Sequence, residues 1–161
     1  MKTEWIYGAI TAICLIAMGV LLGLLYESLF TKIPTNWPSP MDRISEDNIT
    51  ATTGGVCVKL PYKQIIIASL SDTRSMDPTF DAEANLIQFI PHNESEIQVG
   101  DIVAFNGSTT GFGNFSVVHR IVKIGKDKQG TYYVTQGDNL LFSDGKMRFK
   151  DIEEVVLGIL Y

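Results

Sequence analysis

An uncharged apolar run near the start of the chain constrains the fold more than any other feature. Residues 5–26, WIYGAITAICLIAMGVLLGLLY, contain no charged side chain. As an α-helix this run is about 33 Å long, enough to cross a hydrocarbon core of about 30 Å. Trp5, Tyr7 and Tyr26 lie near its ends, where aromatic side chains anchor membrane helices. A cleaved signal peptide, the alternative, would have an apolar core of only about 7–15 residues. We therefore expect a short tail of residues 1–4 and then a retained single-pass anchor in membrane lipid.

The acidic charge of the protein lies outside this run. The formal net charge is −5, and because Lys2 and Glu4 offset each other, residues 27–161 carry all of it. These acids are not accompanied by a Lys/Arg cluster, which argues against nucleic acid as a partner. Cys14 and Cys57 are far apart, and the sequence has neither a CxxC pair nor a His/Cys ligand spacing. We therefore expect unpaired cysteines, no metal site and no cofactor.

The segment after the apolar run has a different composition. Residues 27–61 contain four prolines and many Ser, Thr, Asn and Gly residues, which interrupt regular structure. Two interpretations remain open, a linker or an extended segment that packs along the domain that follows. A short helical turn is expected within residues 44–49.

Residues 62–161 show the pattern of a mostly β domain. Short apolar runs alternate with turn sequences, including those around Gly100 and Gly107, and no long segment has a helical period. The predicted strands are Gln64–Leu70, Asn85–Ile90, Asp101–Phe105, Ser116–Ile124, Thr131–Thr135 and Val155–Leu160.

N-glycosylation sequons are unexpectedly frequent. Four N-x-[S/T] sequences begin at Asn48, Asn93, Asn106 and Asn114. With seven asparagines in the chain, chance would give about one. The excess favours a β domain outside the cytosol, and chance in a loop-rich protein is the alternative.

A polar break between two predicted strands presents a serine. Residues 72–79, DTRSMDPT, follow the apolar run 65–68 and precede a second apolar run. Ser75 is therefore expected at a strand end or tight turn, where its hydroxyl could face a substrate backbone. Pro78 has a restricted φ and biases Asp77 toward an extended conformation. An ordinary turn is the alternative, because a serine becomes a nucleophile only with a base and a carboxylate nearby.

The chain contains candidates for both. His119 lies in a predicted strand, where an imidazole could take a proton from serine and return it to a leaving amine, although a purely structural histidine is the alternative. His92 lies in a polar loop and is expected in solvent. Lys123 shares a strand face with His119 but is roughly 13 Å away. Asp138 and Asp144 lie in turn sequences, and either could orient the histidine.

Four motifs occur in order along the chain: Ser75-Met76-x-Pro78, Val-Gly-Asp101-x-Val, Val-Val-His119-Arg120 and Gly137-Asp138-Asn139 with Asp144. Taken in order, these motifs resemble the sequence boxes of type I signal peptidases. The histidine is similar to that of the archaeal and endoplasmic-reticulum branch, since the bacterial enzymes have lysine in that box. The resemblance covers residues 65–160. It implies the β fold shared by signal peptidases and SOS-repressor autoproteases, on a single N-terminal transmembrane helix. It also implies a catalytic domain on the non-cytosolic side of the cell membrane or of the endoplasmic-reticulum membrane.

The resemblance also implies a role for each site residue. Ser75 would be the nucleophile, His119 the general base and Asp144 the carboxylate that orients the base. Asp138 would be a supporting carboxylate. The backbone N–H of Ser75 would stabilise the oxyanion, with the hydroxyl of Thr73 as a second candidate donor.

The expected function is a membrane-bound serine endopeptidase that removes signal peptides from translocated preproteins, with the secretion translocon as a further partner. Substrates would carry small side chains at the first and third positions before the cut. One alternative is a peptidase of the same fold dedicated to a single surface-protein client. Another is an inactive, membrane-anchored peptide-binding β domain. Arg74 favours the last, because relatives have a small residue there and a bulky cation could crowd the cleft. The apolar Leu140–Phe142 also departs from the family pattern and could contact substrate or lipid.

Overall fold

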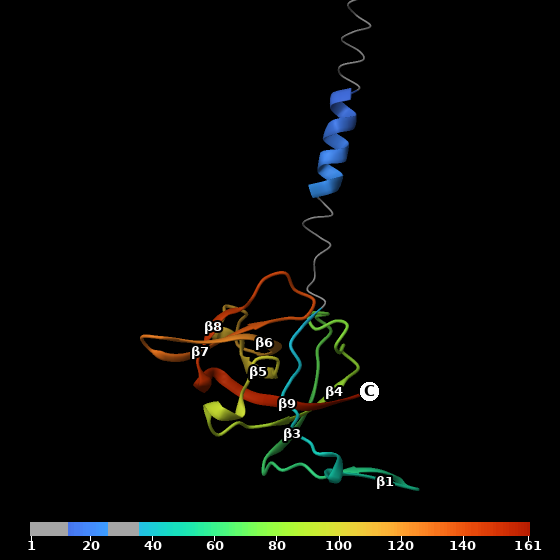
Figure 1. Cartoon of the computed structure of the whole chain (residues 1–161), viewed down its shortest axis with the longest axis vertical. Coiled ribbons are helices and arrows are strands. Elements are labelled where there is room, and N and C mark those ends of the chain that lie inside the picture. Colours follow the sequence, from blue (N-terminus) through green and yellow to red (C-terminus); the bar gives the residue numbers. More distant parts are fainter. Residues whose placement is uncertain (1–12, 26–35) are drawn as a thin grey trace, which may run out of the picture. The chain divides into compact units, whose positions relative to one another are not determined.

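The computed structural model describes residues 13–25 and 36–161, which belong to two separate compact units. Residues 13–25 form an α-helix (Figure 1). None of the helices in these described ranges is long and apolar enough to cross a membrane. Both ends of the expected anchor, the tail before it and the first part of residues 27–61 lie outside the described residues.

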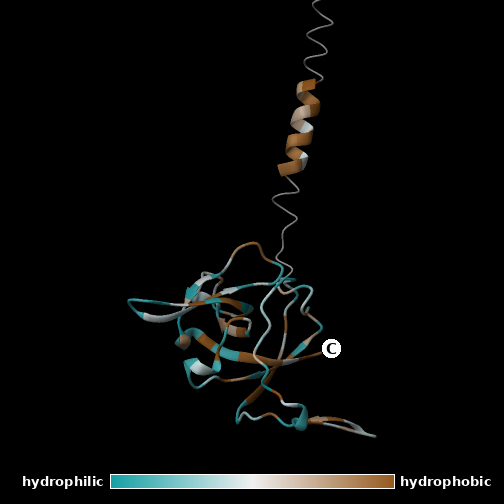
Figure 2. Ribbon diagram, viewed as in Figure 1, coloured by the Kyte–Doolittle hydropathy of each residue, from teal (hydrophilic) through white to brown (hydrophobic). Residues whose placement is uncertain are grey.

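The helix is apolar around its whole circumference. All residues of 13–25, ICLIAMGVLLGLL, are exposed, and Figure 2 shows a largely hydrophobic ribbon. A helix with this pattern is typical of apolar surroundings on every side. Cys14 in this helix and Cys57 in the other unit are both free thiols.

The second unit is built on a seven-stranded antiparallel sheet, so the prediction of a mostly β domain is confirmed. Its strand order is β3-β4-β9-β5-β6-β7-β8, and β3 lies at one edge (Figure 1). Each predicted strand corresponds to an observed one, because an alternating apolar pattern buries one face of a strand. The strands are β3 (Ile65–Ser69), β4 (Asn85–Phe89), β5 (Ile102–Asn106), β6 (Ser116–Asp127), β7 (Gly130–Gln136), β8 (Gly145–Met147) and β9 (Ile152–Leu160).

The strands that the sequence did not predict are short or exposed. β1 (Ile49–Thr52) and β2 (Gly55–Val58) form a separate two-stranded sheet in which every residue is exposed, so no burial pattern marks them. β8 has only three residues. The expected helical turn within residues 44–49 is the 3₁₀ helix η1 (Glu46–Asn48). The other 3₁₀ helices are η2 (Glu94–Glu96), η3 (Gly107–Thr109) and η4 (Phe149–Asp151).

The described segment before η1 packs against the sheet domain. The indole N–H of Trp37 donates to the carbonyl of Asp138 at 3.2 Å. The backbone N–H of Met41 donates to Asp101 at 3.0 Å, and the Arg43 guanidinium forms a buried ion pair with the same carboxylate. Of the two alternatives for residues 27–61, packing along the domain is therefore the one observed over this part.

Two apolar clusters lie on opposite faces of the sheet. Ile102 and Val103 are consecutive on β5, as are Val155 and Val156 on β9, and one member of each pair belongs to each cluster. Consecutive strand residues point to opposite faces, so the clusters are separated by the sheet itself. Met76, next to the candidate nucleophile, packs with Ile102 and Val156. The serine turn is thereby held on that face.

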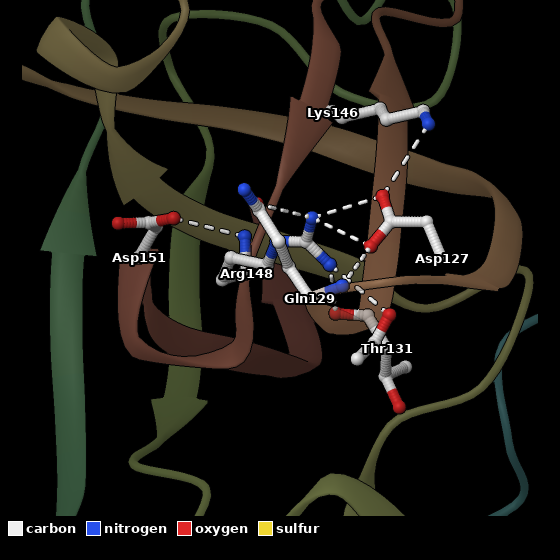
Figure 3. A network of polar contacts seen from close by, with 7 residues as sticks. Asp127, Gln129, Thr131, Lys146, Arg148 and Asp151 are labelled. Carbon is white, nitrogen blue, oxygen red and sulfur yellow. Dashed lines mark hydrogen bonds and ion pairs between the residues drawn. The ribbon is translucent and has the colours of Figure 1, made fainter.

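The far end of the β6–β7 hairpin is held by Arg148. Its Nη2 donates to both carboxylate oxygens of Asp127 at 2.9 Å, and its Nη1 donates to the carbonyls of Gly130 and Thr131 (Figure 3). The backbone N–H of Gln129 is the main cause of a lowered pKa for the Asp127 carboxyl, and Arg148 adds to it. The strand was predicted to end with its apolar run at Ile124, whereas β6 continues to Asp127, where these polar contacts hold it.

Two of the four sequons have a structural role. Asn93 and Asn106 are the N-caps of η2 and η3, and their side-chain oxygens accept the backbone N–H of Ser95 and Ser108 at 3.0 Å. An N-x-S sequence serves as a helix cap at both places.

Candidate active site

Ser75 begins a tight turn of residues 75–79 between β3 and β4. The turn is closed by a hydrogen bond from the N–H of Thr79 to the carbonyl of Met76 at 2.8 Å. Met76 and Phe80 are 2% and 4% exposed, whereas Ser75 is only half-buried. The two buried apolar side chains anchor the turn and leave the serine at its accessible surface.

Arg74 has an unusual backbone conformation immediately before the serine. Its φ is +55°, in the left-handed region that costs a side-chain-bearing residue roughly 1–2 kcal/mol. The side chain is 76% exposed and its Nε lies 3.1 Å from Oδ2 of Asp77. The amide of Asn139 donates to the Arg74 carbonyl at 2.8 Å and so helps to hold the strained residue. The guanidinium pairs with Asp77, and Arg74 also lines the cleft that contains Ser75.

The Gly137-Asp138-Asn139 box lies directly against the serine turn. The N–H of Asn139 donates to the carbonyl of Ser75 at 2.9 Å. A Cβ added to Gly137 would lie 2.6 Å from that same carbonyl oxygen and 2.9 Å from Nε2 of His119. Any side chain at Gly137 would therefore push the serine turn and the imidazole apart.

His119 is oriented by a buried carboxylate. Its Nδ1 lies 2.7 Å from Oδ2 of Asp144, and the two side chains are 4% and 1% exposed. The hydroxyl of Thr135 donates to the same oxygen at 2.8 Å, and the N–H of Asp144 donates to the Thr135 carbonyl at 2.8 Å. Because Nδ1 is occupied by the carboxylate, Nε2 remains to exchange a proton on the side facing Gly137.

Asp138 has a different environment. Its carboxylate accepts hydrogen bonds from Nε and Nη2 of Arg120 at 2.8 and 2.6 Å, and also from the hydroxyl of Thr79. Nη1 of Arg120 donates to the carbonyls of Pro38 and Gly100 at 3.2 and 3.0 Å. Asp138 therefore joins the serine turn to the neighbouring backbone, and its hydrogen bonds do not involve His119.

Thr73 lies beside the nucleophile. Its Oγ1 is 3.0 Å from Oγ of Ser75 and accepts a long hydrogen bond from the Ser75 N–H at 3.5 Å. The backbone donor and this hydroxyl are thus on the same side of the serine. An acyl oxygen that accepted the Ser75 N–H would lie close to the Thr73 hydroxyl.

Ser75 and His119 line one cleft with a volume of about 730 Å³. Much of its wall is apolar, and it includes part of β3, an edge strand with no further strand on its outer side among the described residues. An edge of this kind can pair with an added strand. The apolar lining includes Ile66, Ala68, Leu70, Phe112, Phe115 and Val118.

Some residues considered in the sequence lie elsewhere, and others were missed. His92 and Lys123 are exposed and do not line the cleft. Within residues 13–25 and 36–161, no group of three or more His, Cys, Asp or Glu side chains could hold a metal ion. Thr135 and Asn139 were not singled out as functional. The position of Asn139 directly after Gly137-Asp138 was a signal in the sequence. Thr135 carried no such signal, because its surroundings indicate only a strand.

No protein-family model matches the sequence, and no curated protein or solved structure matches it. What the site can do chemically therefore follows from its own residues: a half-buried serine, an imidazole oriented by a carboxylate, and a cleft that both share.

Proposed function

We propose that the protein is a membrane-anchored serine endopeptidase of the type I signal peptidase family, of the branch with a histidine base, and that it cleaves signal peptides from translocated preproteins. One observation carries the proposal. Asp144 holds the imidazole of His119 through Nδ1. The Nε2 atom of His119 and the carbonyl oxygen of Ser75 both lie within 3 Å of the place that a Cβ atom of residue 137 would occupy, at 2.9 and 2.6 Å.

In the proposed acylation step, Oγ of Ser75 attacks the scissile carbonyl carbon and its proton passes to Nε2 of His119. Asp144 stabilises the imidazolium that forms, and His119 then gives the proton to the leaving amine as the C–N bond breaks. In deacylation, water attacks the acyl carbon while His119 takes its proton. The ester C–O bond then breaks, His119 returns the proton to Oγ of Ser75, and the carboxylic acid is released. In this proposal the N–H of Ser75, which donates a long hydrogen bond to Oγ1 of Thr73 in the structure, and the Thr73 hydroxyl both turn to donate to the negative oxygen of the tetrahedral intermediate.

The substrate in this proposal is an extended peptide segment. The outer edge of β3 can pair with an added strand, which supplies affinity through backbone hydrogen bonds. Residues preceding the cut then meet a wall that includes Ala68 and Val118. Such a wall suits small side chains at the first and third positions before the cut.

The membrane anchor is part of the same proposal. The helix of residues 13–25 exposes apolar side chains on all sides and lies within the uncharged run 5–26. Lipid would cover such a surface, and the catalytic domain would lie on the non-cytosolic side, where signal peptides emerge with the translocon as a neighbour.

The test compares the purified full-length protein with its Ser75→Ala variant in nonionic detergent. A fluorogenic peptide with an Ala-x-Ala cleavage sequence is the substrate. We expect turnover by the wild type, none above background by Ser75→Ala, and near-normal turnover by Ser39→Ala, the same substitution at an exposed serine outside the cleft. Equal turnover by the wild type and Ser75→Ala would rule out this site as the source of activity.

A further inference from the structure

Two polar side chains interrupt the apolar face of the sheet below the cleft. Gln88 on β4 is paired with Ile66 of β3 and with Val156 of β9. Directly paired residues of neighbouring strands point to the same face, so Gln88 lies among apolar side chains. Gln88 and Ile66 both line the cleft that contains Ser75.

Glu154 is the second polar residue. It precedes Val156 on β9 by two positions and therefore points to the same face as Gln88. Its partner on β5 is Ala104, and both also line the cleft. Gln88 and Glu154 are diagonal neighbours on adjacent strands, about 7–8 Å apart at Cα, so one ligand can reach both. Figure 2 shows a hydrophilic stretch within the otherwise largely hydrophobic ribbon of β9.

Neither side chain has a recorded hydrogen bond or ion pair with another described residue. Gln88 is 2% exposed, and its Nε2 has no hydrogen-bond partner among the described residues. The Glu154 carboxylate likewise has no ion pair with any residue in the described part of the chain. Burial raises the pKa of Glu154, and the neighbouring Glu153 raises it further. Buried polar groups in proteins nearly always have partners, so the unpartnered amide of Gln88 in a cleft indicates a partner that comes from outside. Glu154 is only partly buried, and its carboxylate lines the same cleft beside this amide.

The charges around the cleft indicate the sign of that partner. Among the described residues that line it, the basic side chains are Arg74 and His119. Arg74 is paired with Asp77, and His119 is hydrogen-bonded to Asp144. No basic group of the cleft therefore neutralises Glu154, and Glu153 adds negative charge beside it.

We propose that Gln88 and Glu154 form a subsite for a Lys or Arg side chain of the bound peptide. The cationic head group donates hydrogen bonds to the Glu154 carboxylate, and a carbonyl oxygen of the same peptide accepts one from Nε2 of Gln88. This inference rests on the proposed function, because it specifies which peptides the same cleft selects. According to this inference, the protein prefers those signal peptides that have a Lys or Arg residue near the cleavage site.

The strand register gives the distance between Glu154 and the strand that carries His119. Glu154 pairs with Ala104, and Ala104 pairs with Val118, the neighbour of His119. Two strand spacings amount to about 10 Å. A peptide that pairs with β3 runs along the strands and not across them, so this spacing does not fix the sequence position of the basic residue.

A binding experiment tests the subsite independently of turnover. Fluorescein-labelled peptides with an Ala-x-Ala core carry either Lys or Gln at each position in turn, and full-length Ser75→Ala protein is titrated into them in nonionic detergent. We expect about tenfold tighter binding of the Lys peptide at one position of the peptide, as for a charge-assisted hydrogen bond. Glu154→Gln should remove this preference. Gln88→Met should weaken the Lys and Gln peptides equally.

Glu46→Gln, which removes one exposed negative charge outside the cleft, should keep the Lys preference. Equal binding of Lys and Gln peptides at every position would overturn the subsite, as would a preference that persists in Glu154→Gln. Cleavage by the wild type separates the two proposals. Turnover without a preference for Lys peptides would contradict the subsite and leave the peptidase function standing. A Glu154-dependent binding preference without turnover would contradict the peptidase function and leave the subsite standing.

Discussion

Nδ1 of His119 lies 2.7 Å from Oδ2 of Asp144, and that oxygen also accepts the hydroxyl of Thr135. The carboxylate can therefore act on the imidazole directly, whereas Asp138, bound to Arg120, can act on it only through the fold. The two aspartates should consequently differ in what their substitution changes.

Asp144→Asn should lower kcat about 10⁴-fold without unfolding the protein. The amide can present a donor to Nδ1 where an acceptor is needed, which favours the wrong tautomer and leaves the imidazolium unstabilised. Turnover of an Ala-x-Ala peptide and circular dichroism measure the two effects. Thr135→Val, which removes only the second hydrogen bond to the carboxylate, should have a smaller effect. Near-normal turnover of Asp144→Asn would show that this carboxylate is not part of the catalytic unit.

His119→Ala should reduce turnover by several orders of magnitude, and His92→Ala should leave it nearly unchanged. His119 is 3% exposed and lines the cleft, whereas His92 is exposed and lies outside it. His119→Lys should also be poorly active, because the Asp144 carboxylate would keep an ammonium group charged. The assay is the same peptide turnover, and equal losses in the two alanine variants would contradict the assignment.

Asp138→Asn should affect stability more than catalysis. It leaves the buried guanidinium of Arg120 without its bidentate partner, and breaking a buried ion pair costs about 3–5 kcal/mol. We expect the Tm to fall by roughly 10 °C or more. Turnover at 25 °C should fall far less than in Asp144→Asn. Asp81→Asn, an exposed carboxylate, is the control for stability. If Asp138→Asn abolished turnover with an unchanged Tm, the roles of the two aspartates would be reversed.

Asp127→Asn should produce a small stability loss that depends on pH in a defined direction. The pKa of Asp127 is lowered from 3.8 in the folded protein, so its ionised form contributes stability above that value. The contribution is lost as the pH falls through the lowered folded-state pKa. Melting curves from neutral to strongly acidic pH should therefore show the wild type and the variant converging in acid. A difference in Tm that stayed constant across this range would argue against the hydrogen bonds shown in Figure 3 as its cause.

Glu154→Gln should have the opposite pH dependence. Burial, and then Glu153, raise the pKa of Glu154 above 4.5 in the folded protein, so its ionised form opposes folding. The stability present below pH 4.5 in the wild type is lost as the pH rises through the raised folded-state pKa. The variant should therefore melt higher than the wild type at neutral pH, with the advantage shrinking in acid. A lower Tm at neutral pH would mean that the carboxylate has a stabilising partner.

Much of the sheet was predictable because burial leaves a local trace in the sequence. The six predicted strands were found with shifts of only a few residues at their ends. Where burial leaves no alternation, prediction failed, as in the exposed β1 and β2 and the short β8. The extension of β6 to Asp127 was also missed, because it depends on polar contacts with Arg148.

The candidate site divides in the same way. The serine turn, the strand histidine and the two late aspartates were identified from residue types and their order. The strained φ of Arg74 was not, since it depends on Asn139, which is distant in the chain. Nor did composition indicate that Gly137, because it has no side chain, lets the serine turn and the imidazole approach each other.

The sequence by itself determined the mostly β class and the candidates for nucleophile, base and carboxylate, because strand burial and side-chain chemistry are local properties. Only the tertiary structure decided which aspartate meets His119, since Asp144 and Asp138 lie in similar turns and differ in their neighbours across the sheet. It also decided that Gln88 and Glu154 share one face of adjacent strands. Strand order and register are set by contacts between distant segments, and these leave no trace in the local pattern of residues.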